Sequence, residues 1–401
     1  MRILYLSDIR FPIERANGMQ SMETAHALVR RGHVVTFGVR PDIVRPARDP
    51  FVFYGLPRDA RLRIARAPIL GPHRLRRVEF LAWAAARVLA ARGADLVFTR
   101  DLGVADLVRR LPRRPPLVYE SHGYAPVFAE TLPDLVSGAS AATSAKLRRL
   151  TARERAVWHA ADGYVATTAV LAADMAARFG ARPRVAVVPN GTRLPGTAPA
   201  IAPGTRGDAP VAAYAGHLYP WKGVDVFLEA LGRLPHARGL VFGGHEGDAD
   251  MTRVTALAGR LGLSGRVTFG GFVPRAELPD RLAAADVFVL PTLDTPSARY
   301  TCPLKMFEYM AAGRPIVSSD LPPIRDVLVH DVNAMLVPPG DAVALAAAVD
   351  ALAGDPARAA RLAQRAQSDV EQYSWDRRAE RLDDLFAQVL SLTPPQGLTS
   401  M

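Results

Sequence analysis

The sequence predicts an α/β protein with two doubly wound domains, each a parallel sheet covered by helices on both faces. Three observations lead to this prediction. The chain has 401 residues, more than one hydrophobic core usually serves. Short apolar runs alternate with longer amphipathic segments, which is typical of parallel sheets whose strands are buried on both faces. The alternation stops at residues 191–210, where Gly, Pro, Ala and Thr dominate, and then begins again.

The candidate strands are short, continuous apolar runs. In the first half of the chain they are residues 3–6, 34–39, 96–98, 117–119, 164–166 and 185–188. In the second half they are residues 211–215, 240–242, 267–269, 287–290 and 316–318. Residues 19–31 have helical spacing, and Gly32 is expected to close that helix. The last helical segment, 375–392, has no strand after it.

These elements predict how the chain is divided. We expect a first domain at residues 1–195, a linker at 196–209 and a second domain at 210–374. The remaining segment, 375–401, is expected to form a C-terminal helix that packs back towards the first domain. Ligands of open parallel sheets bind beyond the carboxyl ends of the strands, so two such sheets facing each other would form a deep cleft.

The composition excludes several classes of protein. The apolar start at residues 1–6 is too short for a signal-peptide core, and no stretch reaches the roughly 18 apolar residues that a spanning helix needs. The single cysteine, Cys302, favours a reducing compartment, so we expect a cytoplasmic location. The net charge of +11 is mostly spread-out arginine, without the aromatic-interleaved stripe of single-strand binders, so no nucleic-acid partner is expected.

Residues 73–92 form a basic, partly apolar segment with two interpretations. It could lie on a membrane surface, which would suit a lipid-linked acceptor and give the protein a membrane association. It could equally be a helix that covers the first sheet. The covering helix explains the same pattern more simply and is preferred, while a peripheral membrane contact is left open.

The most informative stretch is residues 301–317, Thr-Cys-Pro-Leu-Lys-Met-Phe-Glu-Tyr-Met-Ala-Ala-Gly-Arg-Pro-Ile-Val. It predicts a loop, a helix that opens near Pro303 and ends at residues 313–315, and then a buried strand. The free N–H groups and positive dipole of a helix start suit an anion such as a diphosphate. Glu308 lies too far inside the helix to cap it and could reach a pair of ligand hydroxyls. Alternatively, Lys305 and Glu308 form an ordinary ion pair on a solvated face.

This stretch resembles the donor motif of the retaining GT-B glycosyltransferases of family four, often called glycosyl transferases group 1. Four further segments match that family, and they follow one another in the family's order. They are Tyr-Glu-Ser-His-Gly at 119–123, Val-Val-Pro-Asn-Gly at 187–191, Gly-His-Leu-Tyr-Pro-Trp-Lys-Gly at 216–223 and Phe-Gly-Gly at 242–244. The resemblance implies two Rossmann-like domains facing across a cleft. It also implies an enzyme that moves a hexose-type sugar from a nucleotide diphosphate sugar to a small-molecule, glycan or lipid-linked acceptor, with retention of configuration.

The resemblance also implies roles for particular residues. Lys222 would neutralise the donor diphosphate as a catalytic cation, and His122 would point towards the transferred sugar as the second catalytic residue. Glu308 would bind the ribose hydroxyls, and the amides of residues 301–304 would bind phosphate or sugar oxygens. The implied donor-binding set is His217, Lys222, Gly243, Gly244, Tyr300, Thr301, Cys302, Pro303, Leu304 and Glu308. No cofactor and no metal are expected beyond the nucleotide sugar, which is a co-substrate.

The chain departs from the family pattern at two positions. The family usually carries Glu-x7-Glu, and Tyr300 stands where the first Glu would be. His217 replaces the first residue of the Arg/Lys pair. Relatives that lack the first Glu have the same residue pattern around this position. We therefore expect the chain to belong to a variant subgroup that remains active. These changes leave the contacts to the donor sugar unassigned.

The segment at residues 7–18 stands where the family often has a glycine-rich loop. Here Asn17 and Gly18 alone keep the turn chemistry before the helix, and the absence of GxGxxG disfavours a dinucleotide-dependent dehydrogenase. Asn17, Gly18, Arg10 and Arg100 are the candidate acceptor-binding residues. Asp248 and Asp250 form a DxD pair of the kind that binds metal elsewhere, but a capping position at a helix start explains them without metal.

Two other functions remain open on this sequence. A nucleotide-sugar epimerase has the same architecture and performs isomerisation. A nucleotide-sugar-binding subunit that has lost its activity would also explain Tyr300 and His217.

Overall fold

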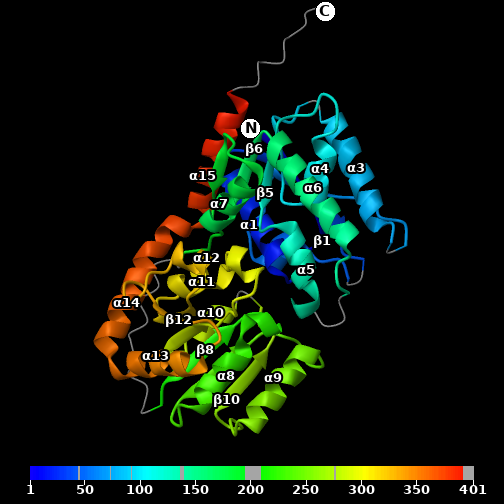
Figure 1. The fold of residues 1–401 in the computed structure, drawn as a ribbon. Coiled ribbons are helices and arrows are strands. Elements are labelled where there is room, and N and C mark those ends of the chain that lie inside the picture. Colours follow the sequence, from blue (N-terminus) through cyan, green and yellow to red (C-terminus); the bar gives the residue numbers. More distant parts are fainter. Residues whose placement is uncertain are drawn as a thin grey trace, which may run out of the picture. The chain divides into compact units, whose positions relative to one another are not determined.

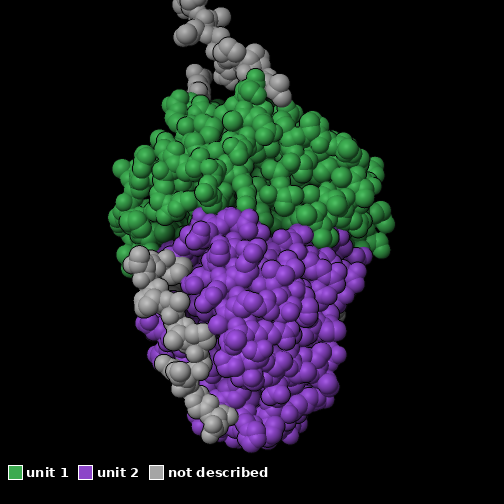
Figure 2. All heavy atoms as spheres, turned by 90° about the vertical axis from the view of Figure 1, so that its left-hand side faces the viewer, with its two compact units in different colours: residues 1–126, 142–190, 375–401 green, residues 127–141, 191–374 purple. Residues whose placement is uncertain are grey.

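The structure is a computed structural model that describes residues 1–43, 46–72, 74–91, 93–135, 140–194, 209–274 and 277–391. Of the expected linker, residue 209 alone is described. Residues 73, 92 and 392–401, which belong to other expected segments, also lie outside the described residues. The chain forms two compact units, coloured separately in Figure 2. Unit 1 comprises Met1–Pro126, Ala142–Asn190 and Trp375–Met401, and unit 2 comprises Val127–Ala141 and Gly191–Ser374.

Unit 1 contains a parallel sheet of seven strands in the order β3-β2-β1-β4-β5-β6-β7. The strands are β1 (Arg2–Phe11), β2 (Val34–Pro41), β3 (Leu62–Arg66), β4 (Leu96–Thr99), β5 (Leu117–Ser121), β6 (Gly163–Ala166) and β7 (Val185–Val187). The helices are α1 (Ala16–Arg30), α2 (Pro50–Tyr54), α3 (Arg76–Ala90), α4 (Leu102–Val108), α6 (Ser144–Ala160), α7 (Ala169–Phe179) and α15 (Trp375–Leu390). The order of the first six strands is that of a doubly wound nucleotide-binding sheet.

Helices cover both faces of this sheet. α1 packs against α15 on one face, whereas α3, α4 and α6 lie next to one another on the other (Figure 1). The preferred interpretation of residues 73–92 is confirmed, because α3 buries Phe80, Ala84 and Val88 and places Trp83 against Gly38 of β2. No helix among the described residues is long and apolar enough to span a bilayer. The membrane contact stays a prediction.

Unit 2 contains a parallel sheet of six strands in the order β10-β9-β8-β11-β12-β13. The strands are β8 (Val211–Ala215), β9 (Arg238–Phe242), β10 (Val267–Gly271), β11 (Val287–Leu290), β12 (Ile316–Ser319) and β13 (Met335–Val337). The helices are α8 (Val224–Gly232), α9 (Ala249–Arg260), α10 (Leu278–Leu282), α11 (Leu304–Ala311), α12 (Pro322–Arg325), α13 (Ala342–Gly354) and α14 (Pro356–Asp369). Three short 3-10 turns are η1 (Pro220–Lys222), η2 (Ala298–Tyr300) and η3 (Val370–Tyr373). α5 (Ala125–Leu135) begins in unit 1 and counts with unit 2 from residue 127 onward.

The start of the chain differs from the expectation of a short strand followed by a loop. β1 continues to Phe11, because after a shift of register Arg10 and Phe11 pair with the end of β2. The buried carboxylate of Asp8 is tolerated within the strand because Arg40 and Arg77 form ion pairs with it. α1 starts at Ala16, so the predicted turn at residues 17–18 is wrong and both residues lie in the first turn of the helix.

The C-terminal helix is tied to unit 1 by charged groups. Arg30 at the end of α1 forms an ion pair with Asp376 at 2.6 Å. His33 Nε2 lies 2.6 Å from Asp383 Oδ1, and Arg31 contacts the same carboxylate. The expected helix at 375–392 ends at Leu390 in the structure.

A close backbone approach in unit 2 predicts a strong effect of one small substitution. Gly243 has φ +132°, and a Cβ added there would lie 1.8 Å from the carbonyl oxygen of Gly216. We expect Gly243→Ala to lower the free energy of unfolding by at least about 2 kcal/mol. Gly259→Ala is the matched control, because Gly259 lies in α9 with open space around it and should gain about 0.5–1 kcal/mol. Urea unfolding of both variants checks this, and equal stability of the two would contradict the packing described.

Candidate functional site

A turn at the carboxyl end of β8 is fixed by backbone contacts. After Ala215, the N–H of Gly216 donates to the carbonyl of Phe242 at 2.9 Å. Gly243, the next residue along that neighbouring strand, has no side chain and therefore allows the two strand ends to approach. The segment 216–219 thus leaves the sheet at a fixed angle.

The following 3-10 turn, η1, is seated against the end of another strand. Gly223 has φ +72°, and a Cβ there would lie 1.8 Å from the carbonyl oxygen of Pro291, which follows β11. The N–H of Leu293 donates to the carbonyl of Trp221 at 3.0 Å. Lys222 therefore projects from a turn that is held by main-chain groups on both sides.

In the part of the chain that the structure describes, no carboxylate balances the charge of Lys222. Burial, together with the positive charge of Lys305, lowers the pKa of Lys222 to about 8. Its Nζ lies 3.9 Å from the centroid of the Trp221 ring. Among the described residues no acid forms an ion pair with it. The positive charge of Lys305 adds to that of Lys222, so this part of unit 2 favours the binding of an anion.

The start of α11 lies in the same part of unit 2. Tyr309 Oη accepts a hydrogen bond from the N–H of Ala215 at 2.7 Å, which pins the helix to the end of β8. Pro303 occupies the capping position, and no described side chain caps the helix. The first N–H groups of α11 are therefore available to a ligand. The Lys305–Glu308 ion pair, the alternative interpretation of these residues, is formed at 2.7 Å.

The other predicted donor residues surround these two elements. The ring of His217 stacks on Tyr219 with centroids 5.1 Å apart. Gly244 follows Gly243 with φ +73°. Tyr300 is 8% exposed and ends η2, so its phenol is largely withdrawn from the surface. The remaining predicted residues, 301–304, precede or open α11. Thr301 Oγ1 donates a hydrogen bond to the carbonyl of Ser297 at 3.0 Å. Cys302 and Leu304 are buried.

The DxD pair is explained by helix structure, although not in the expected detail. Asp248 occupies the capping position of α9, but its carboxylate accepts the N–H of His245 at 3.0 Å and none from the helix. Asp250 lies 3.5 Å from Arg253. Among the described residues no group of three or more His, Cys, Asp or Glu side chains could hold a metal ion. Independence from metal stays a prediction.

A second cluster of charged residues lies at the carboxyl end of β5 in unit 1. Glu120 is fully buried, and its Oε1 accepts a hydrogen bond from Gln20 at 2.6 Å. His122 Nε2 lies 2.6 Å from the same oxygen. Although burial would raise the pKa of Glu120, the nearby Arg378, His122 and Arg100 lower it to about 2. Burial and the charge of Arg100 lower the pKa of His122 to about 4, so the imidazole is neutral at pH 7.

The predicted acceptor residues separate into two groups. Arg100 donates to the carbonyl of Asn17 at 3.3 Å and contacts Gln20, so these residues border the His122 cluster. Gly18 is required by packing, because a Cβ there would lie 2.5 Å from the hydroxyl of Tyr54. Arg10 lies apart from the cluster, because its side chain turns to Asp42 at 3.6 Å.

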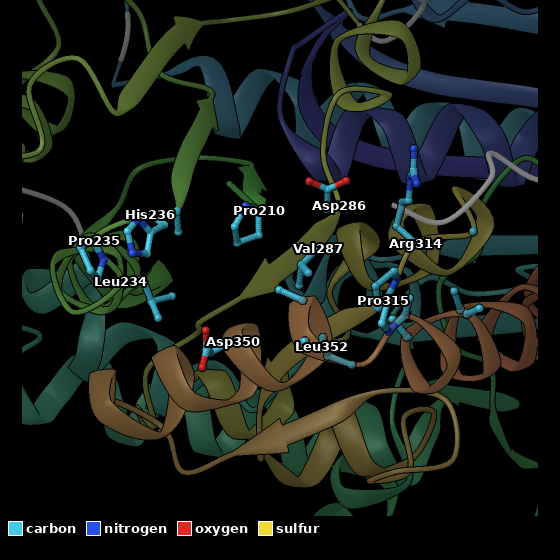
Figure 3. Close-up of a pocket in the computed structure, with 18 residues that line it drawn as sticks. Pro210, Leu234, Pro235, His236, Asp286, Val287, Arg314, Pro315, Asp350 and Leu352 are labelled. Atoms are coloured by element: carbon cyan, nitrogen blue, oxygen red, sulfur yellow. The ribbon is translucent and has the colours of Figure 1, made fainter. Parts of the chain in front are cut away.

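A cavity of about 360 Å³ lies elsewhere in unit 2. Pro210, Val287 and Pro315 line it at the starts of β8, β11 and β12 (Figure 3). It is therefore at the amino edge of the sheet, opposite the carboxyl edge from which Lys222 projects. Its other walls come from α13, α14 and residues 234–237, together with the polar side chains of Asp286 and Arg314. The candidate site is the carboxyl edge, since that is where open parallel sheets bind ligands.

Both halves of the chain match models of known protein families. The model of the glycosyl transferases group 1 family matches residues 209–355, and that of the glycosyl transferase 4-like domain matches residues 18–191. A D-inositol 3-phosphate glycosyltransferase of Catenulispora acidiphila is 32% identical over 296 residues, which are 70% of this chain and 68% of that protein. The chain belongs to the glycosyl transferases group 1 family. A homologous D-inositol 3-phosphate glycosyltransferase of Xylanimonas cellulosilytica is 33% identical over 60% of each chain.

The fold of this group 1 protein is GT-B. A sucrose-phosphate synthase from Thermosynechococcus elongatus matches with a TM-score of 0.77 at 21% identity, covering 98% of this chain and all of the other. Anabaena HepE, solved with UDP-glucose, matches with a TM-score of 0.72 at 19% identity over 97% of this chain and all of the other. The two parallel sheets and these matches confirm the predicted fold class. The chain spans 60% and 62% of the length of the first two curated relatives it matches.

Three members of the His122 cluster were not among the sequence-predicted site residues: Glu120, which occurs only within the family match at 119–123, Gln20 and Arg378. Gln20 lies on α1 within a run of buried positions, where its amide looks like any polar residue of an amphipathic helix. Arg378 comes from α15, 258 positions after Glu120 in the chain. A polar residue on the buried face of a helix is the one local signal that could have drawn attention to either.

The three lysines of the chain allow a direct test of the electrostatics around Lys222. Carbon-13 NMR of the reductively methylated protein gives a signal for each lysine, and we expect the signal that is lost in Lys222→Ala to titrate near pH 8. Lys305→Gln should move that titration upward, towards the usual value of about 10.4, because one source of repulsion is removed. A signal for Lys222 that titrates at the usual lysine value, or that does not respond to Lys305→Gln, would contradict the electrostatics described.

Proposed function

We propose that this chain transfers a sugar from a nucleotide diphosphate sugar held by unit 2 to an acceptor held by unit 1. The observation that carries the proposal is the pairing of Lys222 with Lys305 at the uncapped start of α11. Two cations and a row of free N–H groups suit a diphosphate, which carries charge on several oxygens.

Lys222 is proposed to act on the leaving group. As the bond between sugar and diphosphate breaks, negative charge grows on the departing oxygen, and a fixed cation stabilises that charge more in the transition state than before it. The helix start would add N–H donors. The family's chemistry, which we extend to this chain, retains the anomeric configuration, and the departing diphosphate would itself help to deprotonate the acceptor.

Glu308 is proposed to bind the ribose hydroxyls. It lies on α11 beyond the first turn and holds Lys305 at 2.7 Å. Because a diphosphate would compete for Lys305, the carboxylate could exchange this partner for the hydroxyls of a nucleotide that rests on the helix start. Tyr300 and His217 stand where the family usually has charged residues. The donor sugar would therefore have fewer charged contacts here than in most members of the family.

The relatives suggest which substrates to try first. The HepE structures contain UDP and UDP-glucose, so a UDP-hexose is the first donor to test. Several curated relatives are named for D-inositol 3-phosphate, and Arg100 beside the His122 cluster offers a cation for such a phosphorylated polyol. The acceptor site is proposed to lie among Asn17, Gly18 and Arg100.

A panel of UDP-, GDP-, ADP- and TDP-sugars separates the candidate functions. Slow release of the nucleoside diphosphate, accelerated by an acceptor, supports a transferase. Formation of an epimeric sugar nucleotide would identify an epimerase. Binding of a sugar nucleotide without any turnover would identify a binding subunit that has lost its activity.

Lys222→Ala tests the proposed role of the lysine. We expect the release of nucleoside diphosphate to fall about 100-fold or more, because the cation that stabilises the leaving group is lost. Lys146→Ala, in α6 of unit 1, is the matched control and should stay within about twofold of the unchanged protein. Full turnover by Lys222→Ala would refute the assignment of the donor site.

A further inference from the structure

Arg378 is the most completely engaged charged side chain in the described part of unit 1. It is 1% exposed. Its Nη1 donates to the carbonyls of Val188 and Pro189 at 2.8 Å each, and its Nε donates to Thr24 Oγ1 at 3.1 Å. Its Nη2 contacts Oε2 of Glu120. A guanidinium with this many partners has one orientation, and the carboxylate it holds is equally fixed.

The other oxygen of Glu120 faces the imidazole. His122 Nε2 and Gln20 Nε2 both lie 2.6 Å from Oε1. An ionised carboxylate can only accept hydrogen bonds, so the nitrogen of His122 that faces it must carry a proton. Because the imidazole is neutral at pH 7, Nδ1 then carries none and can accept a hydrogen bond from a hydroxyl group.

We propose that Arg378, contributed by the C-terminal helix, is a positioning residue for His122: through the buried Glu120 carboxylate it fixes which imidazole nitrogen is protonated. The inference rests on the proposed function and on the role that the family resemblance implies for His122, which would point towards the transferred sugar. There the unprotonated Nδ1 accepts a hydrogen bond from a sugar or acceptor hydroxyl. A buried acid that orients a histidine in this way is a recurring device in enzyme sites.

The surroundings of His122 show why the cation is needed. Glu120 on β5 would be raised in pKa by burial if it stood alone. A protonated Glu120 would be able to donate to the imidazole, and the tautomer would no longer be specified. The other charged or titratable groups near this pair are Arg100 after β4 and Tyr5 on β1, whose pKa is raised by burial, so that it stays neutral. Arg100 contacts Gln20, whereas Arg378 contacts the carboxylate itself.

The experiment compares Arg378→Met and Arg378→Lys with Arg377→Met as the control. Arg377 is on the same helix, is exposed and forms an ion pair with Glu380 of that helix at 2.7 Å. The first readout is nitrogen-15 NMR of histidine-labelled protein, with the His122 signals identified by their loss in His122→Asn. It needs no substrate. In the unchanged protein we expect a protonated Nε2 and an unprotonated Nδ1 that do not titrate between pH 5.5 and 8.

Arg378→Met should mix the two tautomers or raise the titration of His122 by at least about one pH unit, since a neighbouring cation is removed. Arg378→Lys keeps the positive charge and should keep the tautomer, although it loses the hydrogen bonds from Nη1 to the carbonyls of Val188 and Pro189. The second readout is kcat, which should fall about tenfold to a hundredfold in Arg378→Met. The acid limb of its pH profile should also move upward, while the affinity for a nucleoside diphosphate, a property of unit 2, stays within about twofold.

Several results would overturn the proposal. If Arg378 serves only to hold the helix in place, both Arg378 variants will melt earlier while the His122 signals and the pH profile stay unchanged. If Arg378→Met does not fold, Arg378→Lys decides the matter, because a changed tautomer with the charge retained would contradict the role assigned here. Failure of the proposed function is distinct: the His122 signals would respond as expected while no sugar nucleotide was turned over by any variant.

Discussion

The proposed donor site, around Lys222 and the start of α11, depends on main-chain contacts that no side chain could replace. Gly243 lets the ends of β8 and β9 come together, and Gly223 lets the Lys222 turn sit against the carbonyl of Pro291. Tyr309 then holds α11 to the last residue of β8. Because the contacts at Gly243 and Gly223 join backbone to backbone, the position of Lys222 is set by the ends of the strands. A cation placed in this way needs little reorganisation when charge develops on a leaving group.

Glu120 in unit 1 and Lys222 in unit 2 have different electrostatic surroundings. In unit 1 the carboxylate of Glu120 is surrounded by Arg378, Gln20 and His122, so that every oxygen has a partner. In unit 2 the described residues give Lys222 no acid, and its pKa falls accordingly. A satisfied network gives a fixed arrangement, as a positioned imidazole requires. Lys222 lacks such a partner, so an anionic ligand that binds beside it would supply the missing stabilisation of its charge.

Most of the fold could be predicted from the sequence because buried parallel strands are continuous apolar runs. β3 was missed because it alternates arginine with apolar residues at the edge of its sheet, and β13 because three residues give no period. The length of β1 was also missed, because its polar second half is stabilised by ion pairs from Arg40 and Arg77. Charge compensation over long sequence distances has no local pattern.

Less of the candidate site than of the fold could be predicted from the sequence. Lys222 and Glu308 were found through the family resemblance, and the structure adds that Lys305 lies close to both. Glu120, which contacts His122, lies only two residues before it, but Gln20 and Arg378 reach Glu120 from α1 and α15 and could not be paired with it from spacing. The structure of the complex with a UDP-hexose or its unreactive analogue tests the central claim most directly. The account predicts the diphosphate within hydrogen-bond distance of Lys222 Nζ and of the first N–H groups of α11, with the ribose at Glu308. A nucleotide bound at the amino edge of the sheet, beside Pro210 and Pro315, would contradict it.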